Sequence, residues 1–158
     1  MAAATGDAPA KEERLRAAIG PRADYYLRRW REMEESGRPY SWNWPACLLN
    51  TFWFAYRRMW APTIVTALAY LVATPFLDPT RPMRFRIAAF SLVGLSFVTG
   101  AFGNLLYRRQ TEKLVAGPAS LEQLRARGGV SLVLAIAALV VLTVLSMAVG
   151  MLPALVRA

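Results

Sequence analysis

The chain has 158 residues, of which 56% are hydrophobic and 18% charged, and its net charge is +9. Soluble domains are usually less apolar and more charged, so this composition favours a single-domain membrane protein. There is no histidine and one cysteine, Cys47. This excludes an internal disulfide, a Cys/His metal cluster, histidine-ligated haem and histidine acid–base chemistry within one chain.

The N-terminal region, residues 1–20, is predicted to be polar. Its first ten residues are rich in Ala, Gly and Pro and are expected to be disordered. From Pro9 to Ile19 the pattern allows a short polar helix, which Gly20-Pro21 would end. The region lacks the apolar core of a secretory signal, so we expect internal spans to direct membrane insertion.

Residues 21–58 are predicted to form a cytosolic segment that starts with an amphipathic helix, ADYYLRRWREMEES. Tyr26, Trp30 and Met33 fall at i, i+4 and i+7, so they share one helical face, and Tyr25 flanks it. This aromatic stripe either packs on the chain's own next segment or forms a docking surface for the membrane interface or a partner.

The next stretch, SWNWPACLLNTFWFAYRRMW at 41–60, holds four of the five tryptophans. Ser41 or Asn43 can cap a helix, and Pro45 suits its first turn. The apolar run 44–56 is about 20 Å long as a helix, against about 30 Å for a bilayer core, so it cannot span.

We therefore expect residues 44–58 to lie in the cytoplasmic membrane interface or to form a shallow re-entrant helix. Trp and Tyr favour that depth, and arginines at the end of the run would be costly any deeper. The expected interfacial anchor, which would also dock the preceding aromatic helix, consists of Trp42, Asn43, Trp44, Trp53, Tyr56, Arg57 and Met59.

Three later runs are apolar and long enough to span a bilayer: 59–77, 87–107 and 130–152. A tight polar loop, DPTRP, separates the first two. Between the second and third, Ser120 with Gln123 predicts a capped short helix that Gly128-Gly129 ends. The predicted fold is all-α and polytopic, with a three-helix transmembrane domain at 59–158 preceded by amphipathic and interfacial helices.

The distribution of basic residues predicts the orientation of these spans. Ten Lys and Arg lie in residues 1–58 and five in the second loop, against three in the first loop region and one in the C-terminal tail. The positive-inside bias therefore places the N-terminus in the cytoplasm and the C-terminus outside. Arg84 and Arg86 fit this orientation least well, because they would have to snorkel to the outer headgroups.

The second span carries a face of small and polar residues: Ser96, Gly100, Gly103, Asn104 and Tyr107. Small residues let helix backbones approach closely in lipid, and an amide can hydrogen-bond across the contact. The face either packs against another span of the chain or binds another membrane protein. A transport site there has no support, because no Asp, Glu or Lys lies inside any span.

No catalytic, cofactor or metal site is predicted. Cys47 is a lone cysteine, expected to be inert. Glu32, Glu34 and Glu35 lie beside arginines on a charged helix and are expected to form solvated ion pairs. Neither a phosphate loop nor a nucleophile elbow is present, and no basic stripe with interleaved aromatics indicates nucleic-acid binding.

Three stretches carry a resemblance to a known family: DYYLRRW at 24–30, the stretch 41–60, and GAFGNLLYRR at 100–109. In this order they resemble a bacterial inner-membrane family whose shared domain has no assigned function. Its signature is YY…W, then SWNW, then an aromatic run ending in Tyr-Arg-Lys-Met, then G…GN…Y. Pro45 and Arg58 depart mildly from that pattern. The resemblance covers roughly residues 24–109 and implies an inner-membrane location but no activity.

These observations together predict a non-enzymatic accessory or interaction component of the bacterial inner membrane. Its expected partners are membrane lipid, including anionic lipid, and another membrane protein or a second copy of itself; nucleic acid is not expected. The alternative is a protomer of a small oligomeric transporter or channel. A membrane enzyme ranks third, because paired acids or histidines near the interface are lacking.

Overall fold

The computed structural model describes residues 7–155, and the side chains of residues 10–151. Within this part of the chain all regular elements are helices and there is no strand. The predicted disorder falls largely on residues 1–6, which lie outside the described residues. The N-terminal helix begins slightly earlier than predicted, at Asp7.

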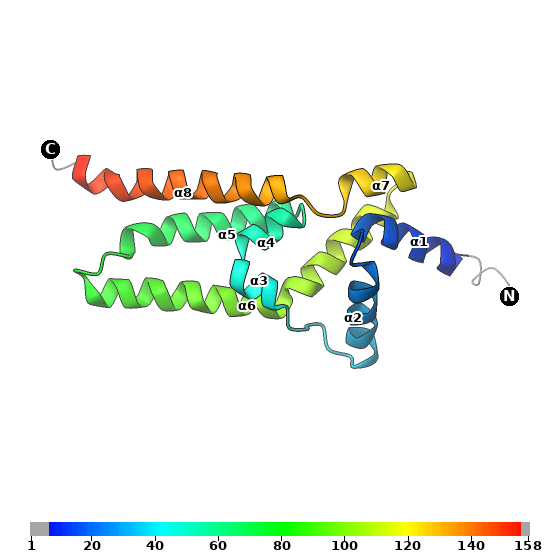
Figure 1. Cartoon of the computed structure of the whole chain (residues 1–158). Coiled ribbons are helices and arrows are strands. Elements are labelled where there is room, and N and C mark those ends of the chain that lie inside the picture. Colours follow the sequence, from blue (N-terminus) through cyan, green and yellow to red (C-terminus); the bar gives the residue numbers. More distant parts are fainter. Residues whose placement is uncertain (1–6, 156–158) are drawn as a thin grey trace.

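The molecule is elongated, with two differently built ends (Figure 1). One end, here called the span end, contains α5 (Trp60–Ala73), the 3-10 turn η1 (Thr74–Phe76), the first part of α6 (Pro82–Ala116) and α8 (Leu132–Leu155). The other end, here called the headpiece, gathers three helices around the last part of α6: α1 (Asp7–Ile19), α2 (Ala23–Glu35) and α7 (Leu121–Arg127).

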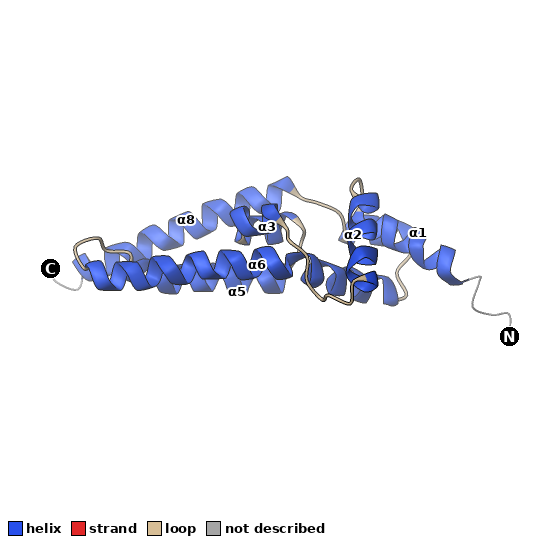
Figure 2. Ribbon diagram, turned by 90° about the horizontal axis from the view of Figure 1, so that it is seen from below, coloured by secondary structure: helices blue, strands red, loops and turns tan. Residues whose placement is uncertain are grey.

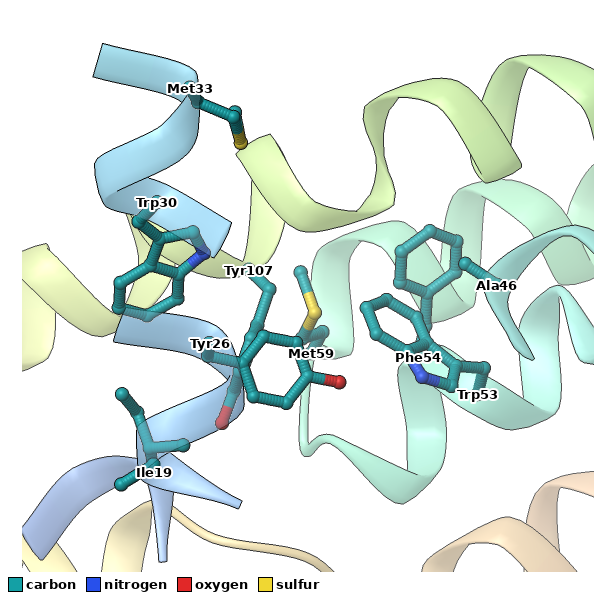
Figure 3. Packing of buried hydrophobic residues seen from close by; sticks show 10 residues of the cluster. Ile19, Tyr26, Trp30, Met33, Ala46, Trp53, Phe54, Met59 and Tyr107 are labelled. Carbon is teal, nitrogen blue, oxygen red and sulfur yellow. The ribbon is translucent and has the colours of Figure 1, made fainter. Parts of the chain in front are cut away.

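The headpiece core forms where α2 lays its aromatic stripe against α6. Tyr26, Trp30 and Met33 are all buried, and the ring of Tyr26 meets that of Tyr107 edge to face at 4.9 Å between centroids. Figure 3 shows these side chains with Ile19, from the end of α1, beside them. The stripe therefore packs on the chain's own structure, mainly on α6.

A second small cluster joins α1 to α7. Leu124 is fully buried among the alanines at the end of α1. The Ser120 and Gln123 capping box starts α7 as predicted, and the helix ends at Arg127, directly before Gly128. The Gly129 N–H then donates to the carbonyl of Ala18 at 2.7 Å, so the predicted glycine stop also fixes α7 onto α1.

The second predicted span, residues 87–107, lies inside a longer helix. α6 runs for 35 residues, from Pro82 to Ala116. Pro82 occupies the first turn, where its missing N–H costs nothing. Beyond the apolar part the helix continues because Arg108 pairs with Glu112 at 2.8 Å, one turn later. At about 52 Å, α6 is longer than a bilayer core and joins both ends of the molecule.

Of the three predicted spans, two lie in helical stretches that are long enough to cross a membrane. Two stretches of the described chain are long and apolar enough to cross a membrane: Pro82–Ala116 and Leu121–Met151, which contains α8. The first predicted span, 59–77, instead forms the 14-residue α5 followed by η1. Pro75 explains the change, since it has no backbone N–H with which to continue the α-helical hydrogen bonds.

The predicted single helix over 44–58 is also wrong. It is two six-residue helices, α3 (Trp44–Leu49) and α4 (Thr51–Tyr56), separated at Asn50. Asn50 has φ 42° and ψ −112°, a positive φ that asparagine tolerates better than most residues. In Figure 2 α3 lies against the middle of α6. The break lets α3 pack on α6 while α4 packs on α5 and α8.

Candidate functional site

The centre of the molecule is the crossing of α3 and α4 over α6. The crossing is close because two α6 glycines face it. A Cβ on Gly100 would lie 2.7 Å from the Cβ of Cys47, and one on Gly103 would lie 2.8 Å from the Cβ of Ala46. Small residues on both sides therefore let the two backbones approach, as the small-residue face of α6 predicts.

A buried amide network, here called the amide clasp, joins the start of α3 to α6. Asn43 accepts a hydrogen bond from the N–H of Ala46 at 3.0 Å and donates to the Oδ1 of Asn104 at 2.7 Å. Asn104, fully buried, donates in turn to the hydroxyl of Ser41 at 2.8 Å. The Asn43 N–H also donates to the carbonyl of Gly100 at 2.8 Å. These bonds fix the register of α3 on α6.

The helix break carries a second set of polar contacts. Asn50 donates to the hydroxyl of Thr99 on α6 at 3.1 Å, and the hydroxyls of Thr51 and Thr66 lie 2.8 Å apart. All four side chains are buried. They tie α3, α4, α5 and α6 together at the level where the span end begins.

Arg57 lies at the end of α4 in a cage of tyrosines that connects α4, α2 and α6. Its guanidinium donates to the hydroxyl of Tyr26 at 2.9 Å and to that of Tyr107 at 3.4 Å. The same group lies over the two rings, at 4.6 Å and 5.0 Å from their centroids, and 5.6 Å from that of Tyr56. This tyrosine cage, Arg57 with Tyr26, Tyr56 and Tyr107, holds a buried cation by hydroxyls and ring faces.

The cage is unusual because no carboxylate of the described residues forms an ion pair with Arg57. Arg57 is only 4% exposed, and its Nε has no hydrogen-bond partner in this part of the chain. Burial raises the pKa of the Tyr26 phenol above its ordinary value, although the positive charge of Arg57 acts in the opposite direction. Tyr26 therefore remains a neutral hydroxyl over the physiological range.

Arg58, the next residue, links the cage to the last two helices. It has φ 57°, a left-handed conformation, and its guanidinium donates to the carbonyl of Ala126 near the end of α7. Gln110 on α6 donates to the Arg58 carbonyl at 3.1 Å, and the N–H of Ser131 donates to the Tyr56 carbonyl at 2.8 Å. The turn 56–58 therefore contacts α6, α7 and Ser131, the residue directly before α8.

The residues of the predicted interfacial anchor do not share one surface. Trp44 is 62% exposed, and Trp42 and Tyr56 are half-buried. The others are buried within the protein: Asn43, Trp53, Arg57 and Met59. The segment therefore packs mainly on other helices of the chain, and among its predicted anchor residues Trp44 is the one with an exposed side chain.

The predicted docking helix and partner face are both covered by this chain. Tyr25 is partly exposed, while Tyr26, Trp30 and Met33 pack inside the headpiece. On α6, Ser96 is half-buried and four residues are buried under α2, α3 and α4: Gly100, Gly103, Asn104 and Tyr107. The sequence left open whether these faces pack within the chain or bind the membrane or a partner, and the structure favours packing within the chain.

Sequence reasoning missed the Thr99 hydroxyl, the break at Asn50 and the burial of Arg57. It considered Ser41 as a helix cap, a role that Asn43 takes. The two adjacent polar residues Asn50 and Thr51 inside an apolar run could have indicated the break, since buried polar side chains need hydrogen-bond partners. Nothing local indicated the cage, because Tyr26 and Tyr107 lie 31 and 50 residues from Arg57.

The hydrogen bonds of this centre join α2, α3 and α4 to α6. Among the described residues no three His, Cys, Asp or Glu side chains are grouped so as to hold a metal ion. The architecture is that of an all-helical protein with an apolar, membrane-compatible end and a polar headpiece.

The sequence comparison gives the family. The family described as "Protein of unknown function (DUF2628)" matches residues 11–113, about two thirds of the chain, and the protein belongs to it. The match contains the headpiece helices α1 and α2, the α3–α4 crossing, α5 and most of α6. No curated protein and no solved structure matches the chain.

Proposed function

We propose that this protein is an integral, non-catalytic component of the bacterial inner membrane that presents its headpiece at the cytoplasmic face and associates with another membrane protein. The observation that carries the proposal is the exposure of α8. None of the most apolar part of the stretch Leu121–Met151 is buried inside the chain. So large an apolar surface needs lipid or a protein partner around it.

The connection of the helices supports three membrane crossings. The segment before α5 is fixed to the middle of α6 by the amide clasp, whereas α6 begins at the far end of the molecule (Figure 1). The chain between them, α5 with η1, must cover the same distance in the opposite direction. With α6 and α8 in a bilayer, α5 crosses beside them, about 27 Å long with its 3-10 turn.

The basic residues support a cytoplasmic headpiece. Three of the ten Lys and Arg in residues 1–58 lie on α2, Arg28, Arg29 and Arg31, and Arg22 lies directly before it. The opposite end of the molecule has three arginines where α6 begins: Arg81 directly before the helix, and Arg84 and Arg86 in its first turns. The positive-inside bias therefore places the N-terminus inside and the C-terminal end of α8 outside.

Two cysteine variants test the location and orientation. Cys47 is buried, and Cys47→Ala provides a cysteine-free background. With Ser36→Cys and Thr80→Cys introduced separately, a membrane-impermeant maleimide should label only the Thr80→Cys variant in cells whose inner membrane is intact. Labelling of Ser36→Cys alone would reverse the orientation, and release of the protein at alkaline pH would exclude an integral location.

Native mass analysis of a tagged chain, gently extracted from its own membrane, tests the role. A stoichiometric complex with a second membrane protein is the expected result. Disruption of that complex by Val140→Phe, a bulky apolar change on the exposed surface of α8, would assign the contact to this helix. A homo-oligomer alone would overturn the accessory role in favour of the transporter or channel alternative.

A further inference from the structure

A groove lies between α5 and α6 in the span end, and its chemistry indicates an occupant. We propose that it holds one acyl chain of an anionic phospholipid whose phosphate binds Arg84. The inference rests on the proposed membrane location and goes beyond it, because it assigns a particular lipid site on the protein.

The groove has a volume of about 820 Å³ and runs along one face of each helix. On α5 and the turn η1 that follows it, the wall is made of residues three or four apart, among them Leu68, Val72 and Phe76. Ala69 and Ala73 on this wall, opposite Ala88 on α6, leave the space between the helices open. A larger side chain at these positions would fill it.

Apart from Arg84, the lining of the groove is apolar or has its polar group already hydrogen-bonded. The other polar residue of the lining is Ser91, whose hydroxyl donates to the carbonyl of Ile87 at 2.8 Å within α6. A wall of hydrocarbon with its one hydroxyl already bonded is suited to an apolar occupant.

The length of the groove matches one leaflet. Its α6 wall extends from Arg84 to Leu95, which is about 16 Å of helix, and half of a bilayer core is about 15 Å. At the inner end the lining stops at Val65 on α5 and Leu95 on α6. An acyl chain that starts at Arg84 would therefore reach the middle of the bilayer and stop there.

Charge favours an anionic headgroup at the open end. Arg84 is exposed and forms no hydrogen bond or ion pair with the described residues, and Arg86 lies one turn or less away on the same helix. Arg81, directly before α6, lies 3.8 Å from Asp78. The positive-inside bias does not account for three arginines at this end of the molecule. A phosphate would give the Arg84 side chain a partner, since guanidinium groups bind phosphate in a two-point geometry.

Photocrosslinking of the purified full-length protein tests the site. The probe is phosphatidylglycerol with a diazirine on one acyl chain, incorporated at low density in phosphatidylcholine vesicles. We expect labelling concentrated on α5 and the first part of α6, with little on the more exposed α8. Unlabelled phosphatidylglycerol should compete at least five times better than added phosphatidylcholine.

Two variants and a matched control assign the contacts. Arg84→Gln should reduce crosslinking about five- to tenfold, the loss expected for one charge-assisted contact. Arg86→Gln, which changes an arginine outside the groove lining, should change it less than twofold. Ala69→Phe should block the groove and give a similar loss to Arg84→Gln, and thermal unfolding will show whether this variant is folded.

Several outcomes would overturn the inference. Equal labelling of α8 and the groove would mean general lipid contact, as would equal competition by the two lipids. Equal crosslinking of the Arg84→Gln and Arg86→Gln variants would remove the phosphate contact. Each result is separate from the membrane location itself, which alkaline extraction measures directly.

Discussion

The headpiece and the span end use apolar residues in opposite ways. In α2, a mostly charged helix, three of the five large apolar or aromatic side chains are buried: Tyr26, Trp30 and Met33. In α8, which is apolar throughout, most large side chains are exposed. The headpiece thus supplies its own core, while the span end relies on its surroundings. A substitution of one residue type should therefore have different effects at the two ends.

Polar contacts follow the same division. The crossing of α3 and α4 over α6 contains long-range hydrogen bonds, such as those of Asn104 with Asn43 and Ser41. In the span end, Ser91 and Thr74 bond only to carbonyls four residues earlier in their own helices. The crossing therefore sets the tertiary arrangement, and the span helices mainly satisfy themselves.

The largest difference is expected for two phenylalanines. Phe54 is fully buried at the crossing, whereas Phe90 on α6 is 74% exposed. Phe54→Ala should lower the free energy of unfolding by about 3–4 kcal/mol, because it removes core contacts and leaves a cavity. Phe90→Ala should change it by less than about 0.5 kcal/mol in detergent.

Urea unfolding in a mild detergent, followed by tryptophan fluorescence, measures both variants. Similar losses for Phe54→Ala and Phe90→Ala would mean that the span end has a packed core of its own. That result would contradict the division of the molecule drawn above.

Two glycines give the second comparison. A Cβ on Gly128 would lie 2.1 Å from the carbonyl oxygen of Ala18, while one on Gly94 would meet nothing within 4 Å. Gly128→Ala should therefore force α7 away from α1 and cost about 2–3 kcal/mol. Gly94→Ala, inside α6, should be neutral or stabilise the helix by up to about 1 kcal/mol.

Limited proteolysis of the N-terminal helix is the direct measurement, since α1 loses a neighbour in the first variant. Faster cleavage of α1 in Gly128→Ala than in Gly94→Ala is the expected result. Equal protection in the two variants would show that α1 does not depend on α7.

The comparison also explains what the sequence could predict. Local signals worked: the break at Gly20-Pro21, the capping box at Ser120 and Gln123, and the periodicity of Tyr26, Trp30 and Met33. Each depends on residues within about two helical turns of one another, and backbone preferences act over that range.

Features that depend on distant residues were not predictable in the same way. A charged residue after an apolar run indicates the membrane interface, yet Arg57 is buried because two tyrosines from other helices surround it. The run 44–58 breaks at Asn50 because Thr99 offers its amide a partner. Tertiary contacts override local preference at both positions.

The tyrosine cage provides the third prediction, of intermediate size. Arg57→Lys should lower the free energy of unfolding by about 1–2 kcal/mol, because an ammonium group cannot cover two rings and reach both hydroxyls as the planar guanidinium does. Arg109→Lys, an exposed change on the adjoining helix α6, is the matched control and should have almost no effect. If the two variants unfold alike, the cage does not stabilise the headpiece.

The smallest effect concerns how the free energy of unfolding falls at alkaline pH. The pKa of Tyr26 is raised by burial in the folded state, so its contribution to stability is complete below about pH 10, the ordinary value of a phenol. That contribution is lost as the pH rises through the raised pKa, because the unfolded chain releases the proton first. Tyr26→Phe should remove this part of the alkaline decline, although it costs about 1 kcal/mol at neutral pH through the lost hydrogen bond to Arg57. Unfolding curves between about pH 8 and pH 11 measure both effects, with the more exposed Tyr25→Phe as control. An unchanged alkaline slope in Tyr26→Phe would show that the headpiece does not hold this phenol away from water.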